Sequence, residues 1–374
     1  MTTADLLVDA GEKLRGSSAF ASVRPGDQLY NVALGIDTAA GYLARGDTVG
    51  ARTQVEYAIR RLETSPGWRR VQASNPNVFE QTNLALCREG LRTVEAQLVS
   101  PQPSPFGYAG LWVVDAGSVD VGLYASAGVA NGFGSLWIKC HDGALDVNVG
   151  KIDGHIAAAR AAGMKTVIGW GWVDTDAAGS AAAAIRNLEA HAFDGYAPNI
   201  EAVAKSDSGG DPFLMDRFVD ALAPSVHVPV AVSTLACASE PNHFGQPDGV
   251  MRFSPVLEAG WAVAPQWYVN ASADSLGTDG SGRWGYRHWV EVGFDEGTIY
   301  PTLGYWHGGQ QSRDVPADEY VRYLVNVKAA YPGFRGLSVY QINELFSEQT
   351  SAADRAWFQA LGQALRANDL AAPI

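Results

Sequence analysis

The chain has 374 residues, of which 47% are hydrophobic and 18% are charged, and its formal net charge at pH 7 is −13. No apolar run approaches the about 20 residues that a membrane-spanning helix needs, so we expect no membrane insertion. An acidic surface repels phosphate backbones, which argues against a nucleic-acid partner. The three cysteines, Cys87, Cys140 and Cys237, have no CxxC spacing, which argues against a disulfide scaffold and against a zinc knuckle.

A proline-rich segment divides the chain. Residues 100–106 hold three prolines, which interrupt helices and central strands, so we expect an extended linker there. Before it, apolar residues recur at helical spacing in residues 4–14, 28–45, 49–63 and 79–98, which predicts a small all-α domain over residues 1–99. Basic and acidic residues balance in residues 1–104, so the whole net negative charge falls on the later part. That early domain carries no cluster typical of catalysis, and attachment or assembly is its expected role.

After the linker, short apolar runs alternate with alanine-rich helical stretches, a pattern typical of repeated βα units. Candidate helices cover residues 149–162, 177–192, 212–222, 316–330 and 351–367. Eight such units over residues 107–374 predict an α/β fold, a (β/α)8 TIM barrel preceded by the small all-α domain. The expected strands are residues 110–116, 135–141, 165–173, 195–201, 228–234, 262–268, 298–304 and 336–342.

Residues 193–201, Phe-Asp-Gly-Tyr-Ala-Pro-Asn-Ile-Glu, are the most informative stretch. In a strand, Asn199 and Glu201 share one side, about 6–7 Å apart along the backbone. Active sites of these barrels lie at the carboxyl ends of the strands, so a polar pair at this position indicates chemistry. The alternative is that Glu201 is a hydrogen-bonded buried acid.

The other expected strands also end in polar and aromatic groups, which we expect to face one mouth. Aromatic rings stack on sugar rings while acids and amides bind the hydroxyl groups, so the mixture predicts a carbohydrate site. The candidate substrate-binding residues are Asp115, Asp142, Trp172, Asp174, Gln266, Trp267, Trp306, Gln341 and Glu344. Trp112, Trp137 and Trp357 are instead expected in the core.

The segment from Asp194 to Glu201 resembles the fourth-strand DGxDxDxE signature of the chitinase-like family 18 glycoside hydrolases. The resemblance implies that Glu201 is the catalytic acid, and that Asn199 and Tyr268 hold the N-acetyl group of a substrate that assists its own hydrolysis. Ala197 and Asn199 stand where the signature has aspartates. An Asn-x-Glu pair is the arrangement of a related endo-N-acetylglucosaminidase family, whereas Ala197 has no such parallel.

The domain order and the acidic, alanine- and glycine-rich composition also resemble minor tail proteins of phages that infect actinobacteria. This implies a cell-envelope polysaccharide as partner, other virion proteins bound through residues 1–99, and a location in the virion. Without that route the expected location is cytoplasmic, because the first residues lack a secretory signal.

Three functions remain open. The first is a glycosidase with Glu201 as general acid and no cofactor, and a conventional variant would pair Glu201 with Glu344 or Asp174. The second is a non-catalytic carbohydrate-binding barrel for host recognition or tail structure, suggested by Ala197. The third is a metal hydrolase with His141, Asp142 and His307 as ligands. No HxH or HExxH spacing supports the third function, and we predict no metal.

Overall fold

The computed structural model describes residues 2–21, 23–24, 27–45, 48–74, 82–97, 104–117, 119–204, 209–235, 251–267, 285–305, 317–340 and 352–371. The chain forms two compact units. The first comprises Met1–Gln102 with Val219–Val228 and Glu258–Gly260, and the second comprises Pro103–Phe218, Pro229–Leu257 and Trp261–Ile374. Two short segments that the sequence assigns to the barrel region are therefore counted with the helical unit.

The first unit contains five helices, α1 (Thr3–Arg15), α2 (Gln28–Ala44), α3 (Thr48–Thr64), α4 (Pro66–Ser74) and α5 (Asn83–Gln97). Thr2 caps α1 through a capping box with Asp5, which satisfies backbone N–H groups at the start of the helix. Leu7, Val55 and Leu91 are fully buried in a single apolar core that all five helices share. Four of these helices match the predicted ones, and α4 was not predicted.

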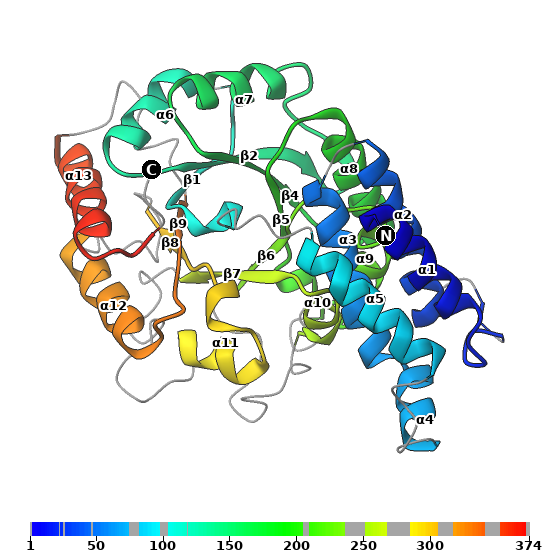
Figure 1. Ribbon diagram of the computed structural model, residues 1–374. Coiled ribbons are helices and arrows are strands. Elements are labelled where there is room, and N and C mark those ends of the chain that lie inside the picture. The colour runs from blue at the N-terminus through cyan, green and yellow to red at the C-terminus, as the bar shows by residue number, and fades with distance from the viewer. Residues whose placement is uncertain are drawn as a thin grey trace. The chain divides into compact units, whose positions relative to one another are not determined.

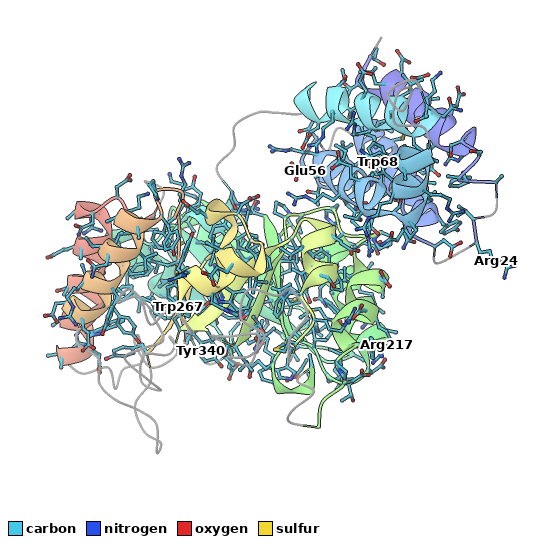
Figure 2. The ribbon with its side chains drawn as sticks, turned by 90° about the horizontal axis from the view of Figure 1, so that it is seen from below. Arg24, Glu56, Trp68, Arg217, Trp267 and Tyr340 are labelled. Carbon is cyan, nitrogen blue, oxygen red and sulfur yellow. The ribbon has the colours of Figure 1, made fainter. Side chains whose placement is uncertain are left out.

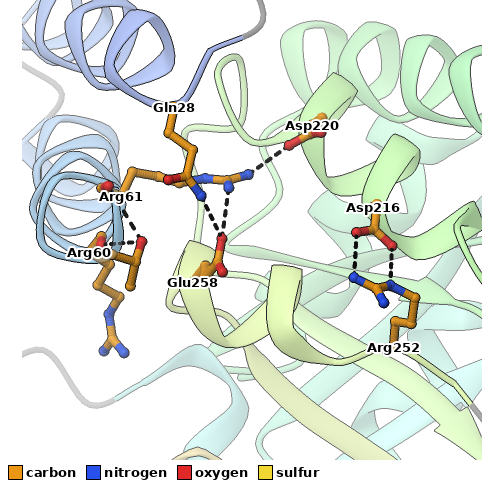
Figure 3. Close-up of polar contacts among 8 residues, drawn as sticks. Gln28, Arg60, Arg61, Asp216, Asp220, Arg252 and Glu258 are labelled. Carbon is orange, nitrogen blue, oxygen red and sulfur yellow. Dashed lines mark hydrogen bonds and ion pairs between the residues drawn. The ribbon is translucent and has the colours of Figure 1, made fainter. Parts of the chain in front are cut away.

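A buried arginine lies within this unit. Arg61 of α3 forms ion pairs with Asp220 at 2.7 Å and with Glu258 at 2.9 Å, and its side chain is only 5% exposed (Figure 3). Its guanidinium also lies over the ring of Tyr57, 5.6 Å from the ring centroid. A buried guanidinium is tolerated only when partners replace its water, and here two carboxylates do so. A second arginine pair in the same figure, Arg252 with Asp216 at 3.0 Å, belongs to the second unit.

The second unit is a closed barrel of eight parallel strands, as predicted. In sheet order the strands are β1 (Gly110–Val113), β9 (Ser338–Tyr340), β8 (Thr302–Gly304), β7 (Ala262–Trp267), β6 (Ala231–Leu235), β5 (Gly195–Asn199), β4 (Thr166–Trp172) and β2 (Ser135–Asp142). Pairing of β1 with β2 closes the ring. A short antiparallel strand, β3 (Leu145–Asp146), extends β2 as a hairpin.

Helices of this unit lie outside the ring of strands, as Figure 1 shows for α6, α7, α8, α12 and α13. This is the arrangement of a (β/α)8 barrel, in which each helix covers the outer apolar face of the strands. The helices are α6 (Val121–Ala130), α7 (Ile152–Ala161), α8 (Ala177–Ala190), α9 (Leu214–Leu222), α10 (Ser254–Ala259), α11 (Tyr286–Val292), α12 (Ala317–Ala330) and α13 (Ala352–Ala367). Helices α6, α10 and α11 were not predicted.

Tryptophans fill part of the barrel interior. Trp112, Trp137 and Trp170 are at most 2% exposed and pack on one another, with ring centroids 4.7 and 5.0 Å from that of Trp112. The expectation that Trp112 and Trp137 belong to the core is therefore confirmed. Large rings on three neighbouring strands leave room only for small residues opposite, and Ala197, Ala231 and Ala264 belong to the same cluster. In the described part of the chain, no helix is long and apolar enough to cross a membrane.

Candidate active site

Three neighbouring strands bring four polar side chains together at the carboxyl end of the barrel. Asn199 ends β5, Glu201 follows it, Ser233 lies on β6 and Gln266 lies on β7. Asn199 pairs in register with Ser233 on one side and with Trp172 of β4 on the other. Because side chains alternate along a strand, residues 197 and 199 face the interior with Glu201 continuing on that side. This arrangement agrees with the prediction that Asn199 and Glu201 share one side.

Direct hydrogen bonds join these groups. Asn199 Nδ2 donates to Glu201 Oε1 at 3.0 Å. Gln266 Nε2 donates to the same Oε1 at 2.7 Å and to Asn199 Oδ1 at 2.9 Å, while Ser233 Oγ lies 3.4 Å from Gln266 Nε2. Asn199 is 3% exposed and Gln266 is 7% exposed, whereas Glu201 is half-buried. Two primary amides therefore converge on one oxygen of Glu201, the acid among these four side chains.

This arrangement leaves the second carboxyl oxygen available. Within the described part of the chain, Glu201 Oε2 forms no hydrogen bond. A carboxylic acid can accept hydrogen bonds at its carbonyl oxygen while the other oxygen carries the proton, so the geometry allows Oε2 to give a proton to a bound group. Asn199 is more constrained, because Oδ1 accepts from Gln266 and one N–H is used on Glu201. The second N–H of Asn199 has no partner among the residues that the structure describes, so it can bind a ligand.

The layer behind this cluster is apolar. Ala197, which stands in the place of a signature aspartate, is fully buried beside Trp170, its register partner on β4. Trp170 Nε1 donates to the backbone oxygen of Val113 at 3.1 Å. No carboxylate therefore stands behind Asn199 at this position of β5.

Two of the three tryptophans proposed to bind substrate lie among the described residues, and they face opposite ways. Trp172 lies two positions after Trp170 on β4, so its side chain also faces the barrel interior. It pairs in register with Asn199 and is half-buried. Trp267, which Figure 2 labels, is fully buried. Its ring packs against that of Tyr286 of α11, with ring centroids 6.1 Å apart. Alternation along β7 turns Gln266 inward and Trp267 outward. The expectation that Trp267 binds substrate is therefore wrong, and it is a core residue.

The predicted acids of the neighbouring loops make local contacts. Asp142 pairs with Lys139 at 2.7 Å. Asp174 accepts from Ser180 Oγ at 3.1 Å and from the backbone N–H of Asp176 at 2.9 Å, and Asp115 accepts from the backbone N–H of Gly117 at 2.9 Å. These hydrogen bonds fix the turns after β1 and β4. The contacts described for the three acids do not include Glu201 or Asn199.

His141 does not face the mouth. The register of β2 against β4 shifts between Lys139 and His141, and after the shift His141 pairs with Gly171 while Asp142 pairs with Trp172. A bulge of this kind reverses the alternation of side chains, so His141 lies on the outer face of the sheet. Its Nε2 lies 2.6 Å from the hydroxyl of Tyr196, and its Nδ1 lies 2.9 Å from the backbone oxygen of Gly143.

Both ring nitrogens of His141 are therefore engaged. The Gly143 carbonyl can only accept, so Nδ1 carries the proton and Nε2 accepts from Tyr196. Burial lowers the pKa of His141 to about 4, so the ring is neutral at pH 7. This corrects the hypothesis of a metal site that includes His141. Among the described residues there is also no group of three or more His, Cys, Asp and Glu that could hold a metal ion.

Sequence reasoning missed two inward-facing residues at this end of the barrel. Lys139 lies over the ring of Trp170, 5.4 Å from its centroid, and its alternation with Trp137 on β2 indicates the inward direction. Tyr340 ends β9, and its ring packs edge-on against Trp112 with centroids 5.7 Å apart. Burial, with the nearby negative charge of Glu201, raises the pKa of Tyr340, so its phenol keeps its proton at pH 7.

Five of the residues named from the sequence lie outside the described residues: Tyr268, Trp306, His307, Gln341 and Glu344. The proposed variant that pairs Glu201 with Glu344 falls there too. Asp174, the other proposed partner, is occupied by Ser180 and Asp176 as described above.

No protein-family model matches the chain, and no curated protein matches it. Among solved structures, the crystal structure of a GH18 chitinase from Pseudoalteromonas aurantia is similar to 69% of this chain and to 100% of its own, with 12% sequence identity and a TM-score of 0.46.

Proposed function

We propose that this protein is a glycoside hydrolase that engages and cleaves N-acetylated cell-envelope polysaccharide, with Glu201 as general acid. The observation that carries the proposal is the convergence of the Asn199 and Gln266 amides on Glu201 Oε1 at 3.0 and 2.7 Å. Glu201 is fixed in this way at the carboxyl end of a (β/α)8 barrel, which is where the active sites of these barrels lie.

The proposed reaction uses one carboxyl group. Glu201 gives the proton on Oε2 to the glycosidic oxygen, and the bond from that oxygen to the anomeric carbon breaks. The substrate's own acetamide oxygen attacks the anomeric carbon, so a second protein carboxylate is not required. The remaining N–H of Asn199 and the hydroxyl of Tyr268 are proposed to hold the acetamide. Glu201, now ionised, then takes a proton from the water that opens the intermediate.

The residues around the acid suit a neutral sugar ring. Trp172 is half-buried at the level of Asn199, and we propose that its ring supports a pyranose face. Asp115, Asp142 and Asp174 are proposed to contact sugar hydroxyls in neighbouring positions, as are Trp306, Gln341 and Glu344. Gln266 is already engaged by Asn199 and Glu201, which limits what it can offer a ligand directly.

A second function is favoured by Ala197. This residue is buried in apolar surroundings beside Trp170, so β5 lacks the inner carboxylate that the family signature has. A barrel that binds glycan without cutting it would retain the aromatic and amide groups and would not need that acid. Such a protein would use the same residues for recognition of a host surface.

Comparison of the native protein with Glu201→Gln tests the proposal. Both proteins would be incubated with an actinobacterial cell-wall fraction, purified peptidoglycan and chitin oligomers, and new reducing ends would be counted. Glu189→Gln on α8, an exposed acid, is the matched control. If the protein is a hydrolase, the native protein and Glu189→Gln should release reducing ends and Glu201→Gln should not. Saturable binding of all three proteins without release would favour the non-catalytic function.

We further propose that the protein is a component of a phage tail, with residues 1–99 bound to other virion proteins. Domain order and composition support this setting, because a helical unit followed by a sugar-directed barrel suits a particle that must attach to a cell wall. Antibodies raised against residues 107–374 should then label the tails of purified particles in electron micrographs. Labelling absent from particles, with the protein detected only in the host lysate, would contradict it.

A further inference from the structure

Gln266 holds a central place among the polar groups at the carboxyl end of the barrel. It is 7% exposed, and its Nε2 lies 2.7 Å from Glu201 Oε1, 2.9 Å from Asn199 Oδ1 and 3.4 Å from Ser233 Oγ. A primary amide has two N–H protons. The two shorter distances are in the ordinary range and the third is at its outer limit, so the protons go to Glu201 and Asn199.

The three side chains form a closed ring of hydrogen bonds. Gln266 donates to Asn199, Asn199 donates to Glu201, and Gln266 also donates to Glu201. A terminal carboxyl group otherwise rotates broadly about its last torsion, because that torsion has no sharp rotamer wells. Two donors from different strands, both aimed at Oε1, fix this rotation. Oε2, which has no hydrogen-bond partner among the described residues, is then presented in one direction.

We propose that Gln266 is a positioning residue that orients the Glu201 carboxyl group and locks Asn199 against it, and is not a ligand of the substrate. This inference rests on the proposed function for the identity of the acid. It assigns the substrate-facing role to Glu201 Oε2 and to the remaining N–H of Asn199. Ser233 has a minor part, because its contact with Gln266 is long.

Kinetics of Gln266→Met separate positioning from binding, since methionine keeps the length of the side chain and removes both donors. The expected result is a fall in kcat of about 10- to 100-fold, the usual cost of a small misplacement of a catalytic group, with KM within about twofold of the native value. Glu189→Gln, at an exposed position of α8 outside the cluster, is the control and should keep kcat within about threefold. An unchanged kcat, or a raised KM at constant kcat, would overturn the proposal.

A second measurement does not depend on turnover. In ¹⁵N-labelled protein, the side-chain amide resonances of Asn199 and Gln266 should both move in Glu201→Gln. Those of Asn199 should also move in Gln266→Met but stay in place in Glu189→Gln. Resonances of Asn199 that are identical in the native protein and in Gln266→Met would overturn the proposal. Gln266→Asn, whose amide is too short to reach Glu201, serves if Gln266→Met does not fold.

The two measurements distinguish the two claims. If the native protein releases no sugar while the Asn199 resonances respond as expected, the proposed hydrolase is wrong and the orienting role of Gln266 stands. If sugar is released and Gln266→Met is as active as the native protein, the hydrolase stands and the orienting role is wrong.

Discussion

Asn199 Nδ2 donates a hydrogen bond to Glu201 Oε1 over 3.0 Å, across the point where β5 ends. An amide at this position holds the acid but cannot itself exchange a proton with it, as an aspartate would. The pair therefore suits a reaction in which Glu201 alone transfers protons and the substrate supplies the nucleophile.

Replacing Trp172 by alanine should weaken glycan binding. Trp172 faces the barrel interior beside Asn199 and is half-buried, and loss of one aromatic platform is expected to lower the affinity about tenfold. Isothermal titration with cell-wall fragments checks the value. Trp267→Phe is the control, because Trp267 faces away from the interior and should leave the affinity unchanged. Equal affinities for Trp172→Ala and the native protein would exclude a role for the Trp172 ring in binding the sugar.

The hydrogen bond between His141 and Tyr196 should contribute to stability. Both residues are fully buried, so Tyr196→Phe leaves the acceptor nitrogen of His141 without a donor. The expected loss is about 1–3 kcal/mol in the free energy of unfolding, measured by urea denaturation. Tyr108→Phe, at a half-exposed position, should change it by less than about 0.5 kcal/mol. A Tyr196→Phe variant as stable as the native protein would show that the pair contributes nothing.

Stability should fall in acid partly through His141. Burial lowers the pKa of His141 to about 4, below the value of about 6.5 that it has in the unfolded chain. Between pH 4 and pH 6.5, His141 is protonated in the unfolded chain but not in the folded chain. The contribution of neutral His141 to the free energy of unfolding is therefore complete above pH 6.5 and is lost as the pH falls towards 4. The free energy of unfolding is expected to change by on the order of 3 kcal/mol over this pH range through His141.

Urea denaturation at pH 7 and pH 4.5 checks this prediction through the slope of stability with pH. His141→Gln should have a smaller slope than the native protein, whatever its stability at pH 7. Burial also lowers the pKa of His288 to about 4, so His288→Gln should reduce the slope in the same direction. A slope unchanged in His141→Gln would mean that the imidazole is not held neutral.

Gly171 on β4 should tolerate no side chain. A Cβ there would overlap the imidazole of His141, so Gly171→Ala must displace the ring and break its bond to Tyr196. Overpacking of this kind costs about 1–3 kcal/mol. Gly154→Ala is the matched control, because its Cβ would meet no atom within 4 Å and it lies in α7, where alanine is favoured by about 1 kcal/mol. The midpoint temperature of thermal unfolding should fall in Gly171→Ala and rise in Gly154→Ala.

The sequence predicted the barrel well because each strand is a short apolar run between turn residues. It also predicted that Asn199 and Glu201 share a side, since that follows from alternation alone. The direction of His141 was predicted wrongly, because one extra residue in β2 reverses the alternation of side chains. The sequence contains no residue pattern that indicates this bulge. Trp267 was misplaced for a different reason: its chemical type suggested a sugar platform, although its neighbour Gln266 already occupied the inward position.

The helices that were missed are short or unusual in pattern. Helix α6 has apolar or small residues on nearly every side, so it shows no helical period, and α10 spans only Ser254–Ala259. The hydrogen bonds from Gln266 to Asn199 and Glu201 join residues 67 and 65 positions apart in the chain. Such contacts depend on strand order and register, which a single sequence does not specify.

The most direct test of the account is release of reducing ends from an actinobacterial cell-wall fraction by the native protein and by Glu201→Gln at equal concentration. Thermal unfolding of both proteins would verify that the substitution leaves the fold intact. The account predicts release by the native protein and none above background by Glu201→Gln. Equal release by the two proteins would contradict the assignment of Glu201 as the general acid.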